Sequence, residues 1–204
     1  MKILVVGATG KTGELAQCKA VAEGHEVTVF GRFVEKIYKN DPVAKTQGDV
    51  LDSAAVAAGV TRQDAVLVCL GPVNLRDRVT LTQGARNICK AMQAQGVEGV
   101  VFISAAGVGD SWRLIPWYSK LLFSAVLKTV LQEHTAEEAI FAESGLNWTA
   151  VRAAVLTNAP ASGHILASNT DRTGTIPRGD LAQYLVAQVA GRHNARVPIS
   201  ITAG

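Results

Sequence analysis

The chain has 204 residues, of which 48% are hydrophobic and 18% are charged, and its formal net charge is +3. This length allows a sizeable core, and this composition excludes an intrinsically disordered chain. Lysine and arginine are scattered along the sequence, which argues against a nucleic-acid-binding surface.

Short apolar runs alternate with helical patterns from the first residues onward. In chain order, the predicted elements are a strand at 2–7, a helix at 11–23, a strand at 26–30, a weak strand at 43–47, a short helix at 52–58, a strand at 64–70, a helix at 77–95, a strand at 98–104, helical sequence at 112–144 with a break near Pro116, strands at 147–153 and 164–168, a helix at 178–190 and a strand at 197–202.

This alternation predicts βαβ units with right-handed crossovers. We therefore expect an α/β fold, a single-domain Rossmann-like doubly wound parallel sheet with its ligand at the carboxyl ends of the strands. Residues 1–204 are expected to form one NAD(P)-binding domain. The segments 105–130 and 157–177 are expected to contribute the substrate side, the second of them as a small C-terminal substrate lobe.

Three cysteines without a CxxC pair, and four histidines without metal-type spacing, predict neither a disulfide framework nor a metal site. Met1 leads almost directly into an apolar run, which leaves no room for a signal peptide. The apolar stretch at 121–131 is interrupted by Lys128 and is too short to span a bilayer. We therefore expect a cytoplasmic protein without membrane insertion.

A glycine-rich turn from Gly7 to Gly13 joins the first predicted strand to the first predicted helix. Gly7 allows a sharp turn, Gly10 lets backbone N–H groups approach a pyrophosphate, and Gly13 allows the helix to pack closely on the strand. The helix N-terminus adds a partial positive charge beside the phosphates. The turn predicts a dinucleotide site; the alternative is a glycine-rich turn without a ligand. The polar residues of the turn are counted with the site: Thr9, Lys11 and Thr12.

The end of the second predicted strand indicates which dinucleotide binds. NAD-binding folds usually place Asp or Glu there, whereas this chain has Arg32, with Lys36 nearby. A 2′-phosphate would pair with these cations, helped by Lys11, so we expect NADPH. The alternative is a solvated arginine on a loop.

Two further strand ends contribute to the predicted cofactor site. Asp49 can accept a hydrogen bond from the adenine amine, and Val50 can flank the ring; Asp49 can equally cap the next helix. Leu70 and Gly71 end the fourth predicted strand, where the backbone passes the cofactor, although this can also be a plain turn.

Several segments together resemble one family. They are the turn 7–13, Arg32, the sequence GDV at 48–50, and the segments 64–71, 83–92, 143–152 and 176–185. They are similar to atypical short-chain dehydrogenases/reductases, and among these to the biliverdin IXβ reductases, also called NADPH-dependent flavin reductases. The resemblance implies NADPH held by the first loop, Arg32, Asp49 and Val50, with Ser104 beside the nicotinamide. It also implies hydride transfer to a planar acceptor such as flavin or a biliverdin-like tetrapyrrole.

The chain departs from this family pattern on the substrate side. The stretch after Ser104 is longer, and 152–155 reads Arg-Ala-Ala-Val where the bilin reductases have Pro-Pro-His. Tyr118 is followed four residues later by Leu122, so the Tyr-x-x-x-Lys pair that protonates an alcohol oxygen is missing. Flavin reduction does not need such an acid, because a flavin can gather protons from water.

Ser104 is the candidate residue nearest to the reacting centre; the alternative is a serine that bonds the backbone at a strand end. An aromatic segment containing Trp112, Trp117, Tyr118 and Phe123 can form a stacking wall for a planar substrate, or else a lid packed on its own core. His134 is interpreted as a solvated helix residue rather than a proton donor.

The sequence thus favours an NADPH-dependent reductase that acts on a flavin, a quinone or a bilin. One alternative is a non-catalytic NADP(H)-binding sensor or assembly factor of the same fold, which the missing Tyr-x-x-x-Lys pair keeps open. A nucleotide-sugar epimerase is less favoured, because the C-terminal lobe is short and that pair is absent.

Overall fold

The computed structural model describes residues 1–37, 42–117, 120, 127–191 and 196–204. Its elements in chain order are β1 (Lys2–Val6), α1 (Lys11–Ala22), β2 (Glu26–Gly31), η1 (Val34–Lys36), β3 (Val43–Gln47), α2 (Ser53–Val60), β4 (Ala65–Val68), α3 (Thr80–Gln95), β5 (Gly99–Ala105), η2 (Gly109–Leu114), α5 (Lys128–Glu143), β6 (Asn147–Ala153), β7 (Val155–Thr157), β8 (Ile165–Ala167), β9 (Thr175–Pro177), α6 (Arg178–Gly191) and β10 (Val197–Ala203).

The main sheet has the strand order β3-β2-β1-β4-β5-β6-β10-β8. Neighbouring strands from β3 to β10 pair in parallel, and β8 pairs antiparallel with β10 at the edge. The order reverses direction between β1 and β4, which creates the crevice where such sheets bind ligands. The predicted Rossmann-like doubly wound sheet is therefore confirmed.

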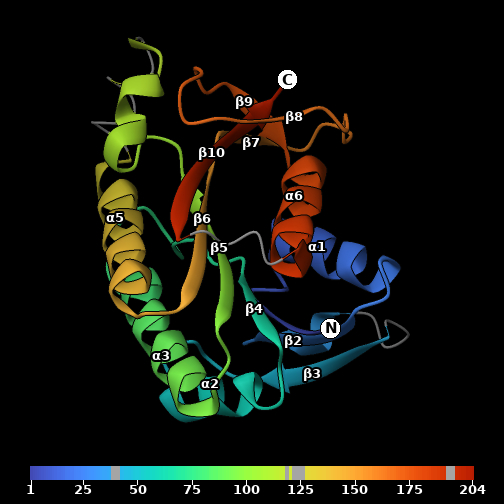
Figure 1. The fold of residues 1–204 in the computed structure, drawn as a ribbon. Helices are drawn as coiled ribbons and strands as arrows, with labels where there is room; N and C mark the ends of the chain where they lie inside the picture. Colours follow the sequence, from blue (N-terminus) through green and yellow to red (C-terminus); the bar gives the residue numbers. More distant parts are fainter. Residues whose placement is uncertain (38–41, 118–119, 121–126, 192–195) are drawn as a thin grey trace.

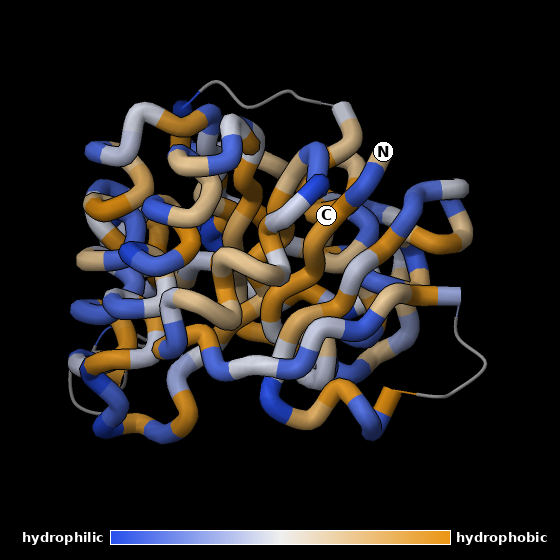
Figure 2. The backbone as a smooth tube through the Cα atoms, turned by 90° about the horizontal axis from the view of Figure 1, so that it is seen from below, coloured by the Kyte–Doolittle hydropathy of each residue, from blue (hydrophilic) through white to orange (hydrophobic). Residues whose placement is uncertain are grey.

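Helices cover both faces of the sheet, with α1 and α6 on one side and α2, α3 and α5 on the other (Figure 1). Because successive strand residues point to opposite faces, Ile3 and Val5 of β1 pack in the core under α1 and α6, whereas Leu4 and Val6 pack in the core under α2 and α3. Figure 2 shows the hydrophobic residues running through the central strands, with hydrophilic residues alternating along the outer helices. Burial on both faces explains the continuous apolar strands.

Most predicted elements appear within a few residues of their expected bounds, and the differences lie between β5 and α6. Helical sequence with a break near Pro116 is expected at 112–144, and the described residues bear this out in part. They form the 3₁₀ helix η2 and then α5, which begins at Lys128. Pro116 lies two residues after the end of η2, and its ring prevents an α-helix from continuing through this point. The short strands β7 and β9 were not expected; they pair in parallel as a separate two-stranded sheet.

Candidate active site

The glycine turn adopts a shape that only glycine supports at two of its positions. Gly7 has φ +80°, and a Cβ there would lie 2.7 Å from the carbonyl oxygen of Cys69. A Cβ on Gly13 would collide with the Gly7 carbonyl and lie 2.9 Å from the Cα of Ala8, so this glycine lets α1 pack on the turn. Gly10 has an ordinary φ of −81°, and it lines both of the cavities described below.

A smaller cavity of about 220 Å³ lies over the carboxyl ends of β1 and β2. Many of the predicted cofactor residues line it: Gly7, Thr9, Gly10, Arg32, Asp49, Val50, Leu70 and Gly71. Arg32 is exposed, and its guanidinium lies 5.6 Å from the centre of the Phe33 ring. Among the described residues, no carboxylate forms an ion pair with Arg32. A cavity with an unneutralised cation at its edge fits a phosphorylated ribose.

The loop after β3 is held in place from α3. The Asn87 side chain is buried and donates a hydrogen bond of 2.9 Å to the carbonyl oxygen of Val50. Asp49 accepts a hydrogen bond of 3.0 Å from the backbone N–H of Leu51, as in an Asx turn. These bonds hold Asp49 and Val50 in place at the edge of the cavity. Asn87 therefore positions the loop after β3 in addition to its part in the packing of α3.

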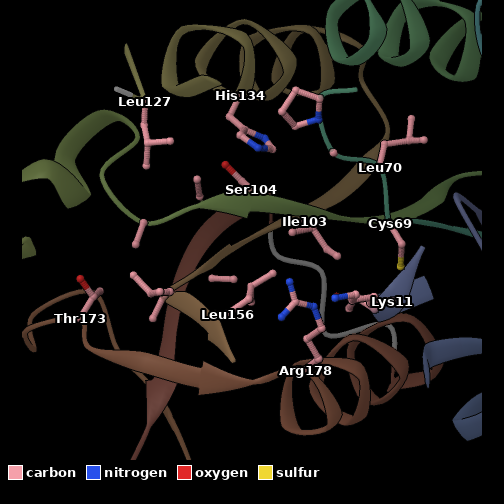
Figure 3. Close-up of a pocket in the computed structure, with 18 of the residues that line it drawn as sticks. Lys11, Cys69, Leu70, Ile103, Ser104, Leu127, His134, Leu156, Thr173 and Arg178 are labelled. Atoms are coloured by element: carbon pink, nitrogen blue, oxygen red, sulfur yellow. The ribbon is translucent and has the colours of Figure 1, made fainter. Parts of the chain in front are cut away.

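A larger cavity of about 470 Å³ continues from the smaller one, and the two share Gly10, Cys69, Leu70 and Gly71. Figure 3 shows Ser104 and His134 above the end of β5, and Lys11 and Arg178 on the opposite side. Much of the remaining lining is apolar: Ile103, Ala105, Ala106, Ile115, Pro116, Leu127, Ala153, Ala154, Val155 and Leu156. An apolar cavity with a few polar groups suits a conjugated organic ligand.

Ser104 belongs to a buried polar network. Its hydroxyl donates a hydrogen bond of 2.6 Å to Glu138 Oε1. Arg152 donates to both oxygens of the same carboxylate, through Nε at 2.9 Å and Nη2 at 2.7 Å, and its Nη1 pairs with Asp110. The Arg152 guanidinium holds the pKa of the Asp110 carboxyl below its usual value. Because the Ser104 proton is committed to Glu138, the serine oxygen can accept a hydrogen bond from a ligand.

Glu138 is not among the residues predicted from the sequence, although a signal was available. Arg152 lies within the buried strand β6 and is only 5% exposed. A buried guanidinium requires an acidic partner, and the acidic α5 segment supplies it.

Lys11 and Arg178 line the larger cavity, and neither is among the described residues that line the smaller cavity beside Arg32. Lys11 is the first residue of α1 and Arg178 the first residue of α6, and their side chains point toward each other (Figure 3). Arg178 donates a hydrogen bond of 3.2 Å to Asn158 Oδ1. Neither cation forms an ion pair with any carboxylate that the structure describes. Two adjacent cations without an anion form a site suited to phosphate or carboxylate.

The interpretation of His134 as a solvated residue is wrong. His134 is 5% exposed and lines the larger cavity, because α5 packs its face against α3 and β5. Its Nδ1 lies 3.0 Å from Oε2 of Glu137, which is itself buried. The charged residues on either side of His134 made this stretch of the sequence look exposed.

The structure does not place the expected aromatic wall at the cavity. The described lining residues include neither Trp112 nor Trp117, and Trp117 is 84% exposed. Trp112 lies beside Gly107, with the Lys120 ammonium 5.8 Å from its ring. Tyr118 and Phe123 lie outside the described residues.

A family model described as NAD(P)H-binding matches residues 7–191. The chain belongs to this NAD(P)H-binding family. The matched residues include the glycine turn, Arg32, Ser104 and Arg178. No described helix of this NAD(P)H-binding protein is both long and apolar enough to cross a membrane.

Three curated relatives carry names that describe them as uncharacterised. The chain is 32% identical to a chloroplastic protein of Arabidopsis thaliana, over 93% of this chain and 70% of that protein. It is 27% identical to a much longer Mycobacterium tuberculosis protein, over 76% of this chain and 15% of that protein. It is 24% identical to the uncharacterised sugar epimerase YhfK of Bacillus subtilis, over 100% and 95% of the two chains.

Solved structures share the fold. The anaerobilin reductase ChuY of Escherichia coli O157:H7 superposes with a TM-score of 0.86 at 20% identity, over 100% of this chain and 97% of that one. A short-chain dehydrogenase/reductase of Veillonella parvula in complex with NADP gives 0.83 at 18% identity, over 98% and 94%. At these identities the likenesses show a shared fold, which is the fold that the resemblance to atypical short-chain dehydrogenases/reductases implied.

Proposed function

We propose that this protein is an NADPH-dependent reductase that transfers hydride to a planar conjugated acceptor such as a flavin or a biliverdin-like tetrapyrrole. One observation carries the proposal: two cavities meet at Gly10 and Gly71. One bears Arg32, which forms no ion pair with any described carboxylate, and the other is lined by apolar residues around Ser104. A dinucleotide that spans both would place its adenosine beside Arg32 and its nicotinamide beside Ser104. The acceptor would fill the rest of the larger cavity.

Arg32 supports the choice of NADPH over NADH. It stands where an NAD-binding fold usually offers a carboxylate to the ribose hydroxyls, and a 2′-phosphate would neutralise it. Lys11 and Arg178 meet at the start of α1, where such folds hold the pyrophosphate, so they would bind it from both sides. The turn residues Thr9 and Thr12 line the same path.

When bound, the reduced nicotinamide would supply the hydride. The Ser104 oxygen would accept a hydrogen bond from the carboxamide and fix the orientation of the ring, while Glu138 and Arg152 keep the serine in place. Segment 105–130 contributes Ile115 and Leu127 to the larger cavity, and segment 157–177 contributes Thr173 and Gly174. This lining supports the assignment of both segments to the substrate side, within one NAD(P)-binding domain over residues 1–204.

The test is to mix the protein with NADPH and one acceptor at a time (FMN, a quinone or biliverdin) and to follow the loss of reduced-nicotinamide absorbance. We expect turnover with at least one acceptor, and a matched reaction with NADH that is slower at low cofactor concentration. Binding of NADPH without turnover of any acceptor would overturn the reductase and favour the non-catalytic sensor or assembly factor.

A further inference from the structure

A buried histidine–carboxylate pair stands at the edge of the larger cavity and is not used by the function proposed above. His134 and Glu137 are three residues apart on α5, which places both on one face of the helix. The imidazole Nδ1 lies 3.0 Å from Glu137 Oε2, and the two side chains are 7% and 1% exposed. Figure 3 shows the ring projecting from α5 towards Ser104.

Only one nitrogen of this ring is committed within the protein. Glu137 bonds Nδ1, and no hydrogen bond from Nε2 to any described residue is recorded. A carboxylate that is hydrogen-bonded to one ring nitrogen fixes the tautomer of the imidazole and the direction in which the other nitrogen points. Because the ring lines the cavity, Nε2 is the atom that can meet a ligand there.

The surroundings of Glu137 raise the pKa of its carboxyl. Burial raises the pKa of the Glu137 carboxyl, the bond to His134 opposes this rise, and the nearby carboxylates of Glu138 and Glu133 add to it. From α3, burial raises the pKa of the Cys89 thiol to about 11, so this group is neutral.

The remaining neighbours do not neutralise Glu137. Arg152 of β6 is committed to Glu138 and Asp110, and Glu133 accepts a hydrogen bond from Thr82 of α3. Ser104 of β5 carries no charge. Among the described residues, His134 is therefore the group that bonds the Glu137 carboxylate.

We propose that His134 donates a proton from Nε2 to the acceptor in the larger cavity and that Glu137 positions the imidazole for this transfer. The assignment rests on the reductase function proposed above. The acceptor gains a hydride from the reduced nicotinamide at one atom of a conjugated double bond, and a proton from Nε2 at the other. The acceptor is thereby reduced by two electrons and the nicotinamide is oxidised. The imidazole is left with its proton on Nδ1, bonded to Glu137, and takes up a new proton from water.

This inference separates two classes of acceptor. A flavin takes hydride at one ring nitrogen and can gather its proton from water, so it does not need His134. A bilin held in an apolar cavity must receive a proton at a defined atom, and a positioned general acid typically contributes about 10²–10⁴-fold. Reduction of the bilin should therefore depend on His134 much more than reduction of the flavin.

The first experiment uses nuclear magnetic resonance on the cofactor-free protein. Ring ¹⁵N signals of His134 are assigned by their loss in His134→Gln and followed between about pH 5 and 8. We expect Nε2 to be protonated over part of this range. We also expect the Nδ1 signal to differ from that of the wild type in Glu137→Gln and to resemble that of the wild type in Glu137→Asp. An Nε2 that stays unprotonated throughout would overturn the assignment.

The second experiment compares His134→Gln with His164→Gln, whose imidazole is exposed. With biliverdin, we expect kcat of His134→Gln to fall about 100-fold or more, and we expect the decrease of kcat at alkaline pH to disappear. FMN reduction by the same variant should change less than about threefold. His164→Gln should match the wild type. Equal losses with both acceptors, or no loss with biliverdin, would refute the proton donor, whereas a wild type inactive with every acceptor would refute the reductase itself.

Discussion

In the function proposed here, Arg32 is the residue that selects NADPH over NADH. It is exposed at the edge of the smaller cavity and forms no ion pair with the described carboxylates, so a 2′-phosphate would gain a charge-assisted contact. We predict that Arg32→Ala weakens NADPH binding by about 1–3 kcal/mol and NADH binding much less. Dissociation constants from nicotinamide fluorescence measure this, with Arg86→Ala as the control cation on α3. An equal loss for both cofactors would show that Arg32 does not contact the 2′-phosphate.

The two ion pairs of Arg152 should differ in strength because their burial differs. The Glu138 side chain is 12% exposed, whereas the Asp110 side chain is 61% exposed. Removing one partner of a buried pair leaves a charge without compensation, so Glu138→Gln, which leaves the buried Arg152 guanidinium without this carboxylate, should lower the free energy of unfolding by about 3–5 kcal/mol. Asp110→Asn should cost less than about 1 kcal/mol. Urea denaturation measures both variants, and similar losses would contradict this division.

At the scale of elements, the turn between β1 and α1 offers a paired test of packing against binding. Gly13→Ala places a methyl group against the Gly7 backbone, so we expect a loss of about 1–3 kcal/mol in stability. Gly10→Ala has an allowed backbone conformation and meets nothing closer than 3.3 Å, so it should fold but weaken NADPH binding at least about tenfold. Thermal unfolding and cofactor titration of both variants measure the two effects. Unchanged NADPH binding in Gly10→Ala would show that this turn does not contact the cofactor phosphates.

The loop before α3, which borders the smaller cavity at Val73 and Thr80, is fastened by Asp77. Partial burial raises the pKa of Asp77, but hydrogen bonds from Thr80, Val73 and Val79 outweigh it and lower the pKa to about 2. A carboxyl with a lowered folded-state pKa stabilises the fold fully above its unfolded value of 3.8, and this contribution disappears as the pH falls towards 2. We predict that Asp77→Asn flattens the decline in unfolding free energy between about pH 4 and 2. Urea unfolding across this range measures how the free energy of unfolding changes with pH. An equal decline in the wild type and in Asp77→Asn would contradict the prediction.

The elements themselves were largely predictable because local signals determine them. Buried parallel strands such as β1 and β4 are continuous apolar runs, Asp52 caps α2 with two hydrogen bonds, and Gly96 ends α3 in the left-handed conformation. The strands β7 and β9 have three residues each and are stabilised by pairing with each other, which no local pattern records. Pro116 predicts a break in the helical sequence at 112–144, but it does not predict that the residues before it form the 3₁₀ helix η2.

At the scale of the molecule, much of the lining of the smaller cavity was predictable, and the polar network around Ser104 was not. The turn 7–13, Arg32 and Asp49 follow strands whose order the βαβ pattern determines. The network of Ser104, Glu138 and Arg152 joins β5, α5 and β6, and its members are up to 48 residues apart in sequence. Whether these three side chains contact one another depends on how α5 is rotated about its axis on the sheet, and neither composition nor sequence spacing specifies this rotation.

The whole fold also brings residues from near the two ends of the sequence to one cavity. α1 packs against α6, and their first residues, Lys11 and Arg178, enter the same cavity. A cofactor bound between them would link these helices, and NADPH at about 100 times its Kd would add about 2.7 kcal/mol to the free energy of unfolding. If Arg178→Ala costs about 1.4 kcal/mol in binding, the same NADPH concentration would add only about 1.4 kcal/mol.

Hydrogen exchange locates this effect within the fold. In the wild type we expect NADPH to increase protection in the first turns of both α1 and α6, whereas in Arg178→Ala the gain should persist in α1 and shrink in α6. Lys19→Ala, in the last turn of α1 and paired with Glu23, should behave like the wild type. Protection of α6 that is the same with and without Arg178 would mean that the C-terminal helix holds the cavity wall but does not bind the cofactor.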